Sequence, residues 1–125
     1  MHLVAIAFAG GLGALARYSL TGITHRFAAG DFPVGTLLVN TLGCLVLGII
    51  TPLLAERAHL PEHYRMGVMI GFLGSFTTFS TFGFDTVDFV QAGQWSKAAL
   101  NVGASLLLGL GAVMVGIAIA TKIDG

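Results

Sequence analysis

The residues best suited to binding a small ion lie close together between positions 71 and 83. Hydroxyl groups surround an aromatic position there, on Thr77, Thr78, Ser80 and Thr81, and glycines stand on both sides. Threonine is stiff at χ1 and glycine costs backbone entropy in a helix, so a helix through this stretch is predicted to be interrupted. An interruption inside a membrane frees backbone polar groups, which survive only when buried in protein or lining a cavity, where they commonly bind ions. The alternative is a continuous helix whose hydroxyls bond back to the preceding turn.

Phenylalanines three residues apart form a stripe in the same stretch, at Phe76, Phe79 and Phe82. Such a stripe is usually packing between helices. The chemical alternative depends on the ring quadrupole, whose edge is positive, because two ring edges can flank a small anion without trapping it by a full charge. Binding of that moderate strength suits an ion that must pass through and leave.

Further polar residues lie in two apolar stretches that carry no charge. The Asn40 amide offers two donors and one acceptor, and Thr36 lies one turn earlier on the same helical face. These side chains would form either a hydrogen-bonded seam between helices or part of a polar track for an ion. Asn101 and Ser105 repeat the same spacing in the last apolar stretch.

Arg17 is the basic residue inside an apolar stretch. A charged side chain at membrane depth is expensive, which makes it a functional candidate by default. Its long stem would let the guanidinium reach the interface if Arg17 lies near a helix end. Alternatively, Arg17 lines an aqueous cavity and makes it attractive to anions. The two interpretations are compatible.

The scaffold that positions these side chains is predicted to lie in a membrane. Of the 125 residues, 55% are hydrophobic, 18 more are glycine and only 10% are charged, whereas a soluble domain carries about 25% charged residues. These figures exclude a soluble domain of this length and a disordered chain. The formal net charge of +0 argues against a nucleic-acid partner. The lone cysteine, Cys44, excludes a disulfide framework and a cysteine-based zinc site.

Apolar segments at about 3–23, 33–54, 66–90 and 98–121 each approach the roughly 20 residues that a helix needs to cross the hydrocarbon core. Because lipid cannot satisfy backbone polar groups, these segments are predicted to be helices. The expected fold is an all-α integral membrane protein with four transmembrane helices per subunit. It would form a single transmembrane domain over 1–125, with the third helix broken in mid-membrane. The first segment lacks a basic leader and a cleavage site, so we interpret it as a mature helix and not a signal peptide.

The loop charges give little preference for one orientation. One side of the membrane would hold Arg57, Arg65 and Lys122, and the other Arg26 and Lys97. Orientation follows the Lys and Arg count in short loops. A difference of one charge is either just sufficient to fix one orientation, or it allows the chain to insert in both orientations. In the second case the two orientations would form an antiparallel homodimer. Four helices are also few for enclosing a pore in one protomer, which favours a dimer.

No enzyme site is predicted. Residues 11–16 match a glycine-rich dinucleotide fingerprint, but the strand that must precede it is absent from a stretch predicted to be one helix. Residues 59–63 match a zinc-protease pattern that requires a helix, and Pro61 interrupts one there. A nucleophile, a histidine and an acid cannot be placed together in one site.

The chain resembles the CrcB/Fluc family of fluoride channels over essentially its whole length. The motifs that carry the resemblance are GGLGALARY at residues 10–18, GTLLVN at 35–40 and GFLGSFTTFSTF at 71–82. The third is highly specific, whereas the first alone would be weak. The resemblance implies a dual-topology antiparallel homodimer in the inner membrane of a prokaryote. The dimer would contain two fluoride pores, through which fluoride would leave the cell passively.

The resemblance also implies roles for individual residues in the pore. Asn40 would donate a hydrogen bond to fluoride, and Phe79 and Phe82 would meet the ion with their ring edges. Arg17 would match the family's first-helix arginine, in an anion vestibule. The polar track would contain Ser80, Thr81, Thr36 and Ser105.

A sodium ion at the centre of the dimer is a further implication of the resemblance. It would be structural and not transported. Backbone carbonyls of Gly74 and Thr77, contributed by both subunits, would hold it on the two-fold axis.

Two other functions suit a small four-helix membrane protein. A small multidrug-resistance transporter should carry a membrane-embedded carboxylate in its first helix, where this chain has Arg17, whereas its acids Asp85 and Asp88 lie in the third segment. A non-transporting assembly protein would use the polar residues only to join helices. Asp85 itself is unexpected near the far end of an anion pore, because a carboxylate repels an anion.

Overall fold

Apolar helices make up nearly the whole molecule. The computed structural model describes residues 1–57 and 59–125, and within them it contains helices and connecting turns but no strand. Four helical stretches are long and apolar enough to cross a membrane: His2–Phe27, Val34–Glu56, Glu62–Gln91 and Trp95–Asp124. The predicted all-α architecture with four spans is therefore confirmed.

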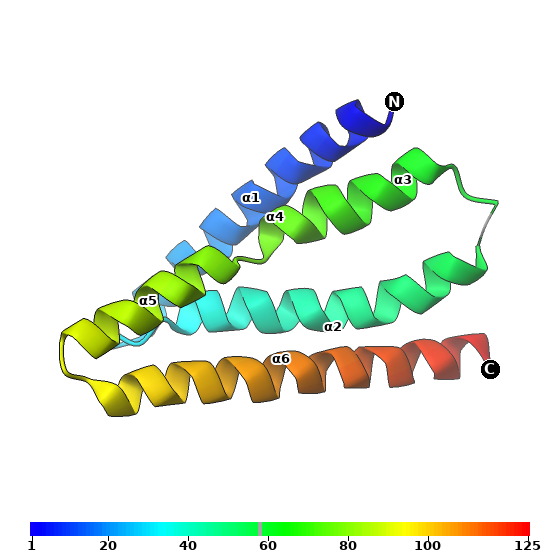
Figure 1. Ribbon diagram of the computed structural model, residues 1–125. Coiled ribbons are helices and arrows are strands. Elements are labelled where there is room, and N and C mark those ends of the chain that lie inside the picture. Colours follow the sequence, from blue (N-terminus) through cyan, green and yellow to red (C-terminus); the bar gives the residue numbers. More distant parts are fainter. Residues whose placement is uncertain (58) are drawn as a thin grey trace.

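Single helices form three of the spans, and Figure 1 shows them as α1 (His2–Phe27), α2 (Val34–Glu56) and α6 (Trp95–Asp124). The third span is composite. It begins as α3 (Glu62–Met66), continues through the π-helical segment η1 (Gly67–Leu73) into α4 (Gly74–Phe76), and resumes as α5 (Phe79–Gln91). Thr77 and Thr78 separate α4 from α5.

Each span extends beyond the segment predicted from hydropathy, because a helix continues into polar residues until the backbone forces it to stop. Pro33 and Pro61 directly precede α2 and α3. Gly30, between α1 and α2, has φ +99°, and Gly93, between α5 and α6, has φ +74°. Glycine adopts such positive φ values without the steric penalty of a side chain, so these residues allow the chain to reverse.

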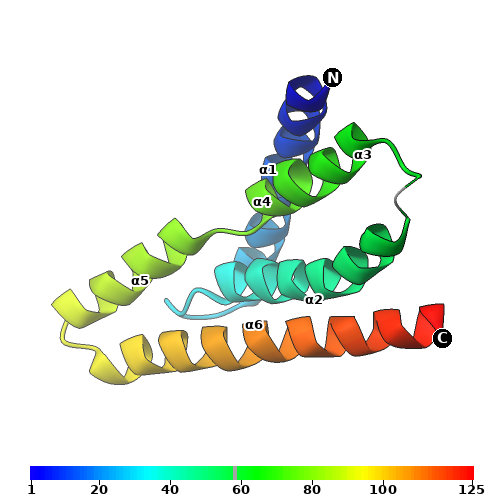
Figure 2. The same ribbon diagram turned by 45° about the vertical axis from the view of Figure 1, so that its right-hand side comes forward.

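The helices pack as two closely apposed pairs. Helix α2 lies along α6, and α1 crosses η1 and α4, as the two views in Figures 1 and 2 show. A Cβ on Gly48 of α2 would stand 2.5 Å from the Val113 carbonyl oxygen, and one on Gly116 of α6 would stand 2.5 Å from that of Leu45. Glycines therefore let α2 and α6 approach backbone to backbone, as is common in membrane bundles.

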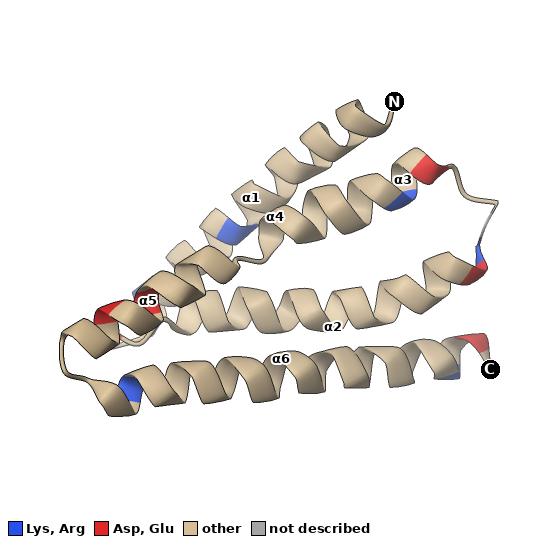
Figure 3. Cartoon of the chain, viewed as in Figure 1, with Lys and Arg blue, Asp and Glu red and all other residues tan. Residues whose placement is uncertain are grey.

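The chain ends and connections sort to two ends of the bundle. The N-terminus, the α2–α3 connection and the C-terminus lie at one end, and the other two connections lie at the opposite end (Figure 1). Figure 3 shows that most charged residues lie near these ends, with one basic position along α1. At the far end, Lys97 in the first turn of α6 is paired with Asp31 between α1 and α2, with 2.6 Å between Nζ and Oδ1. The hydrogen bond from the Lys97 ammonium lowers the pKa of the Asp31 carboxyl.

The apolar side chains are mostly on the outside. The buried apolar core consists of Val39, Leu73, Phe89, Ala98 and Ala120. Large apolar side chains such as Phe8, Leu107 and Met114 are more than two-thirds exposed, at 72%, 77% and 71%. Exposed apolar surface of this extent marks contact with lipid or with another protein.

Candidate functional site

The Thr77–Thr78 link separates two helix ends, and the hydroxyls of both threonines cap them. Both residues have extended backbones, with ψ of 156° and 113°. The Thr77 amide and hydroxyl both donate to the Leu73 carbonyl, at 3.1 and 3.0 Å. The Thr78 hydroxyl oxygen accepts from the Thr81 amide at 3.3 Å, which makes it the N-cap of α5.

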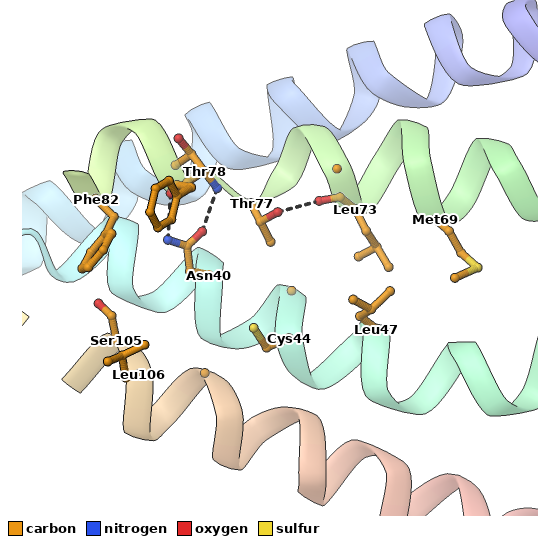
Figure 4. Close-up of a pocket in the computed structure, with 14 residues that line it drawn as sticks. Asn40, Cys44, Leu47, Met69, Leu73, Thr77, Thr78, Phe82, Ser105 and Leu106 are labelled. Atoms are coloured by element: carbon orange, nitrogen blue, oxygen red, sulfur yellow. Dashed lines mark hydrogen bonds between the residues drawn. The ribbon is translucent and has the colours of Figure 1, made fainter. Parts of the chain in front are cut away.

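Asn40, on α2, supplies hydrogen bonds that the link would otherwise lack. Its Oδ1 accepts from the Thr78 amide at 2.7 Å, and its Nδ2 donates to the Thr78 carbonyl at 3.0 Å (Figure 4). Buried backbone groups need such partners when the helical ladder stops. The side-chain amide has two N–H groups, so one remains for a further acceptor. Asn40 thus forms the predicted interhelical bond and still has a donor for a ligand.

The carbonyl oxygens of the residues from Gly74 to Thr77 lose their helical partners at the link. In a continuous helix the Gly74 oxygen would accept from the Thr78 amide, and the Thr77 oxygen from the Thr81 amide. Those two amides instead donate to Asn40 and to the Thr78 hydroxyl. Carbonyl oxygens are the ligands that hard cations prefer, so the chemistry of Gly74 and Thr77 fits such an ion.

Arg17 satisfies another of these carbonyls at the same helix end. Its Nε donates to the Ser75 carbonyl at 3.0 Å, in a partly buried position. The Phe79 amide, which would be the partner of Ser75 in a continuous helix, lies beyond the link. The guanidinium is therefore anchored to the third span by its Nε.

A groove of about 350 Å³ runs along one side of the link. It is mainly apolar, and Figure 4 shows Asn40, Phe82 and Ser105 around it, contributed by three different spans. Of the predicted site residues, those that line this groove are Asn40, Gly74, Thr77, Phe79, Phe82 and Ser105. The two phenylalanine rings lie 5.6 Å apart between centroids and are tilted by 49°.

A second and larger cavity, of about 920 Å³, opens on the other side of Thr78. The predicted residues Arg17, Thr36 and Thr81 line it, together with Arg26 and Asp85. Thr78 lines both cavities. The predicted residues are thus divided between an apolar groove and a charged vestibule that meet at the link.

Two residues lie apart from this arrangement. Ser80 is exposed and is not among the lining residues of either cavity, although its hydroxyl is 3.3 Å from that of Thr78. Phe76 stacks on Phe72, with centroids 5.9 Å apart and an interplanar angle of 10°. The phenylalanine stripe is therefore split, because Phe76 packs with the residues before the link and Phe79 pairs with Phe82 after it.

Thr78 is one of the hydroxyl residues of the 71–83 stretch, but the sequence pattern assigns it no role of its own in the site. Its backbone binds Asn40, its hydroxyl caps α5, and its side chain borders both cavities. A threonine three residues before Thr81 at a helix start is a recognisable N-cap signal. Asn101, singled out for its spacing, is 2% exposed and donates to the Thr86 hydroxyl at 3.0 Å.

Comparison with known proteins is consistent with this arrangement. Residues 4–117 match the family model described as CrcB-like protein, Camphor Resistance (CrcB). The fluoride-specific ion channel FluC of Maridesulfovibrio salexigens is 42% identical over 118 residues, which cover 94% of both chains. That of Hydrogenovibrio crunogenus is 44% identical over 94% of this chain and 89% of its own. FluC 2 of Symbiobacterium thermophilum is 46% identical over 91% of this chain and 93% of its own.

These relatives are named as ion channels and not as enzymes. The match runs through all four spans and includes the three motifs that carried the resemblance. The chain therefore belongs to the CrcB family of multi-pass membrane proteins.

Proposed function

We propose that this protein is a fluoride-selective channel through which fluoride leaves the cell passively. The observation that carries the proposal is the Thr77–Thr78 link. Asn40 binds this link, and Asn40, Phe79 and Phe82 line the same groove beside it. Relatives of the same length and of 42–46% identity are named fluoride-specific ion channels, which supports fluoride as the ion.

The groove offers fluoride partial replacements for its hydration shell. The second N–H of Asn40 donates to the ion, and the Ser105 hydroxyl is a further donor at the same groove. Phe79 and Phe82 present positive ring edges, which attract an anion more weakly than a charged side chain does. Such moderate attraction lets the ion enter and leave. Thr36, Thr81 and Ser80 extend the hydroxyl track toward the vestibule.

Arg17 and Arg26 line the vestibule, and their positive charges attract an anion. Asp31 and Asp85 line the same cavity and oppose that attraction, although Asp31 is paired with Lys97. A membrane potential that is negative inside contributes about 2.3 kcal/mol per unit charge per 100 mV. This potential drives fluoride outward, so the channel needs no energy source of its own.

The functional unit in this proposal is an antiparallel homodimer in the inner membrane, with two pores. Phe79 is 82% exposed in the single chain, and the groove beside it is open on one side. A second copy in the opposite orientation would cover the groove and put the link near mid-membrane. The near balance of loop charges, with Arg57, Arg65 and Lys122 against Arg26 and Lys97, is compatible with insertion in both orientations.

Sodium is the proposed structural ion of the dimer and is not transported. The Gly74 and Thr77 carbonyl oxygens of each subunit would hold it, since their helical partners are engaged elsewhere. A hard monovalent cation between oxygen ligands would join the two copies of the link.

The test is fluoride efflux from potassium-loaded liposomes with valinomycin, in sodium-containing buffer, beside the same assay with chloride. Fluoride release without chloride release is expected, with a large loss in Asn40→Ala and Phe79→Ala. Thr41→Ala and Phe84→Ala are matched controls, since Thr41 and Phe84 line neither cavity. Their efflux should equal that of the unmodified protein.

If the rate of fluoride efflux is unchanged by the Asn40 and Phe79 substitutions, the protein is still a fluoride channel but the pore proposed here is wrong. A folded dimer that releases no fluoride would overturn the function and favour a transporter or an assembly protein. Chloride release as fast as fluoride release would overturn the selectivity.

A further inference from the structure

Arg17 replaces a lost helical bond immediately beside the proposed sodium ligands. Its Nε donates to the Ser75 carbonyl at 3.0 Å, although the two residues are 58 positions apart in the sequence. Ser75 follows Gly74 directly and precedes Thr77 by two residues. The guanidinium therefore holds the peptide that lies between the two carbonyls proposed to bind sodium.

The packing of α1 fixes where this guanidinium lies. Gly13, one turn before Arg17, faces the Phe72 backbone so closely that a Cβ there would overlap it. A Cβ on Gly10 would stand 3.2 Å from the Ser75 Oγ. Helix α1 cannot slide along η1 and α4 without breaking these contacts. The planar guanidinium on this helix is thus a geometrically defined donor.

From this geometry we infer that Arg17 is a positioning residue that orients the Gly74 and Thr77 carbonyls for sodium, beyond lining the anion vestibule. The inference rests on the proposed function, because the sodium site is part of it. Without Arg17 the Ser75 carbonyl would lack a partner in a partly buried place and would turn toward another donor. Neighbouring peptide planes share a Cα atom, so this rotation would move the Gly74 carbonyl as well.

A purely electrostatic role for Arg17 predicts the opposite change. The guanidinium and a bound sodium ion are both positive and repel each other. Removing the charge alone would therefore strengthen sodium binding, whereas removing the hydrogen bond would weaken it. The direction of the change distinguishes positioning from charge.

The experiment is the thermal unfolding midpoint of the purified full chain in detergent, measured against sodium concentration at constant ionic strength with N-methylglucamine. Ligand binding to the folded state raises this midpoint. We expect Arg17→Lys and Arg17→Gln to raise the half-saturating sodium concentration about tenfold, the loss of one charge-assisted hydrogen bond. Arg26→Gln is the matched control, because Arg26 lines the same vestibule without a hydrogen bond to the link, and its sodium requirement should not change.

An unchanged sodium requirement in both Arg17 variants, or a lower one in Arg17→Gln, would overturn the inference. If neither variant folds, Gly10→Ala tests it with Arg17 intact. Its Cβ would stand 3.2 Å from the Ser75 Oγ and crowd the residue whose carbonyl Arg17 binds, so it should raise the sodium requirement by a smaller factor. If the thermal unfolding midpoint of the unmodified protein does not depend on sodium, both the sodium site and this inference are overturned. Fluoride efflux by the same preparation would then show that the channel itself is not in question.

Discussion

The two halves of the third span are held in different ways. Before the link, η1 and α4 lie against α1 through glycines, where backbone meets backbone at Gly13 and Gly71. After the link, α5 lies against α6 through side chains, with Asn101 bonded to Thr86 and Phe89 buried. Glycine contacts tolerate no added atom, whereas a side-chain contact can adjust its rotamers. The upstream half is therefore a rigid support and the downstream half an adaptable one.

This difference suits what each half presents to the site. The upstream half carries the Gly74 carbonyl and the Ser75 carbonyl bonded to Arg17, where small displacements would alter the ligands of a cation. The downstream half carries Phe79 and Phe82, whose rings would have to accommodate a passing ion in the proposed pore. Asn40 joins the two halves because it binds the backbone of Thr78 between them.

The largest loss of stability is expected when a methyl group is added on the rigid upstream half. Gly13→Ala should destabilise the protein by about 2–3 kcal/mol, because the new Cβ overlaps the Phe72 backbone. Gly11→Ala on the same helix and Gly83→Ala on α5 meet no atom within 4 Å. Each should be neutral or stabilising by up to about 1 kcal/mol. Denaturation of the purified protein in detergent measures all three, and equal losses at Gly13 and Gly83 would contradict the comparison.

The next effect is expected where the halves join. Asn40→Ala should cost about 2 kcal/mol, because it leaves the Thr78 amide without a partner and removes the side-chain donor to the Thr78 carbonyl. Asn40→Asp keeps an acceptor for the Thr78 amide and should recover part of this stability. Its negative charge should nevertheless abolish fluoride efflux. Recovery of stability and efflux together in Asn40→Asp would contradict the role of the amide N–H.

A smaller effect is expected on the adaptable side. Asn101→Ala and Thr86→Val each remove one partner of a buried hydrogen bond, and each should cost about 1 kcal/mol. In the double variant the losses should not add, since both substitutions remove the same bond. Additive losses would show that the two side chains act independently. Fluoride selectivity should change less in these variants than in Asn40→Ala.

The smallest effect concerns the ends of the bundle. The hydrogen bond from Lys97 lowers the pKa of Asp31 in the folded protein, so the ionised carboxylate favours folding. This stabilisation is present above the ordinary pKa of about 4 and is lost as the pH falls through the lowered value. The unfolding midpoint should therefore fall by a small amount as the pH drops below about 4, and Asp31→Asn or Lys97→Gln should remove this decrease. The same pH dependence in Asp31→Asn would assign it to another group.

Hydropathy was sufficient to predict the number of spans and their approximate positions, since only an apolar helix satisfies its own backbone in lipid. It placed the C-terminal ends of the helices too early, because polar residues such as Thr24, His25 and Arg26 remain helical and α1 ends only at Phe27. The motifs also indicated the correct family. They assigned no individual role to Thr78, because its hydrogen bonds to Asn40 involve backbone groups and depend on how two spans pack.

The sequence by itself determined the four apolar spans, the polar residues within them and the glycines that let helices approach. Those properties depend on composition and on spacing along one helix. Only the tertiary structure decided the hydrogen-bond partners: Arg17 donates to the Ser75 carbonyl, whereas Asn40 donates to the Thr78 carbonyl and accepts from the Thr78 amide. It also decided that Gly13 meets backbone while Gly11 meets nothing. These outcomes depend on the relative rotation and register of different helices, which no pattern within a single span specifies.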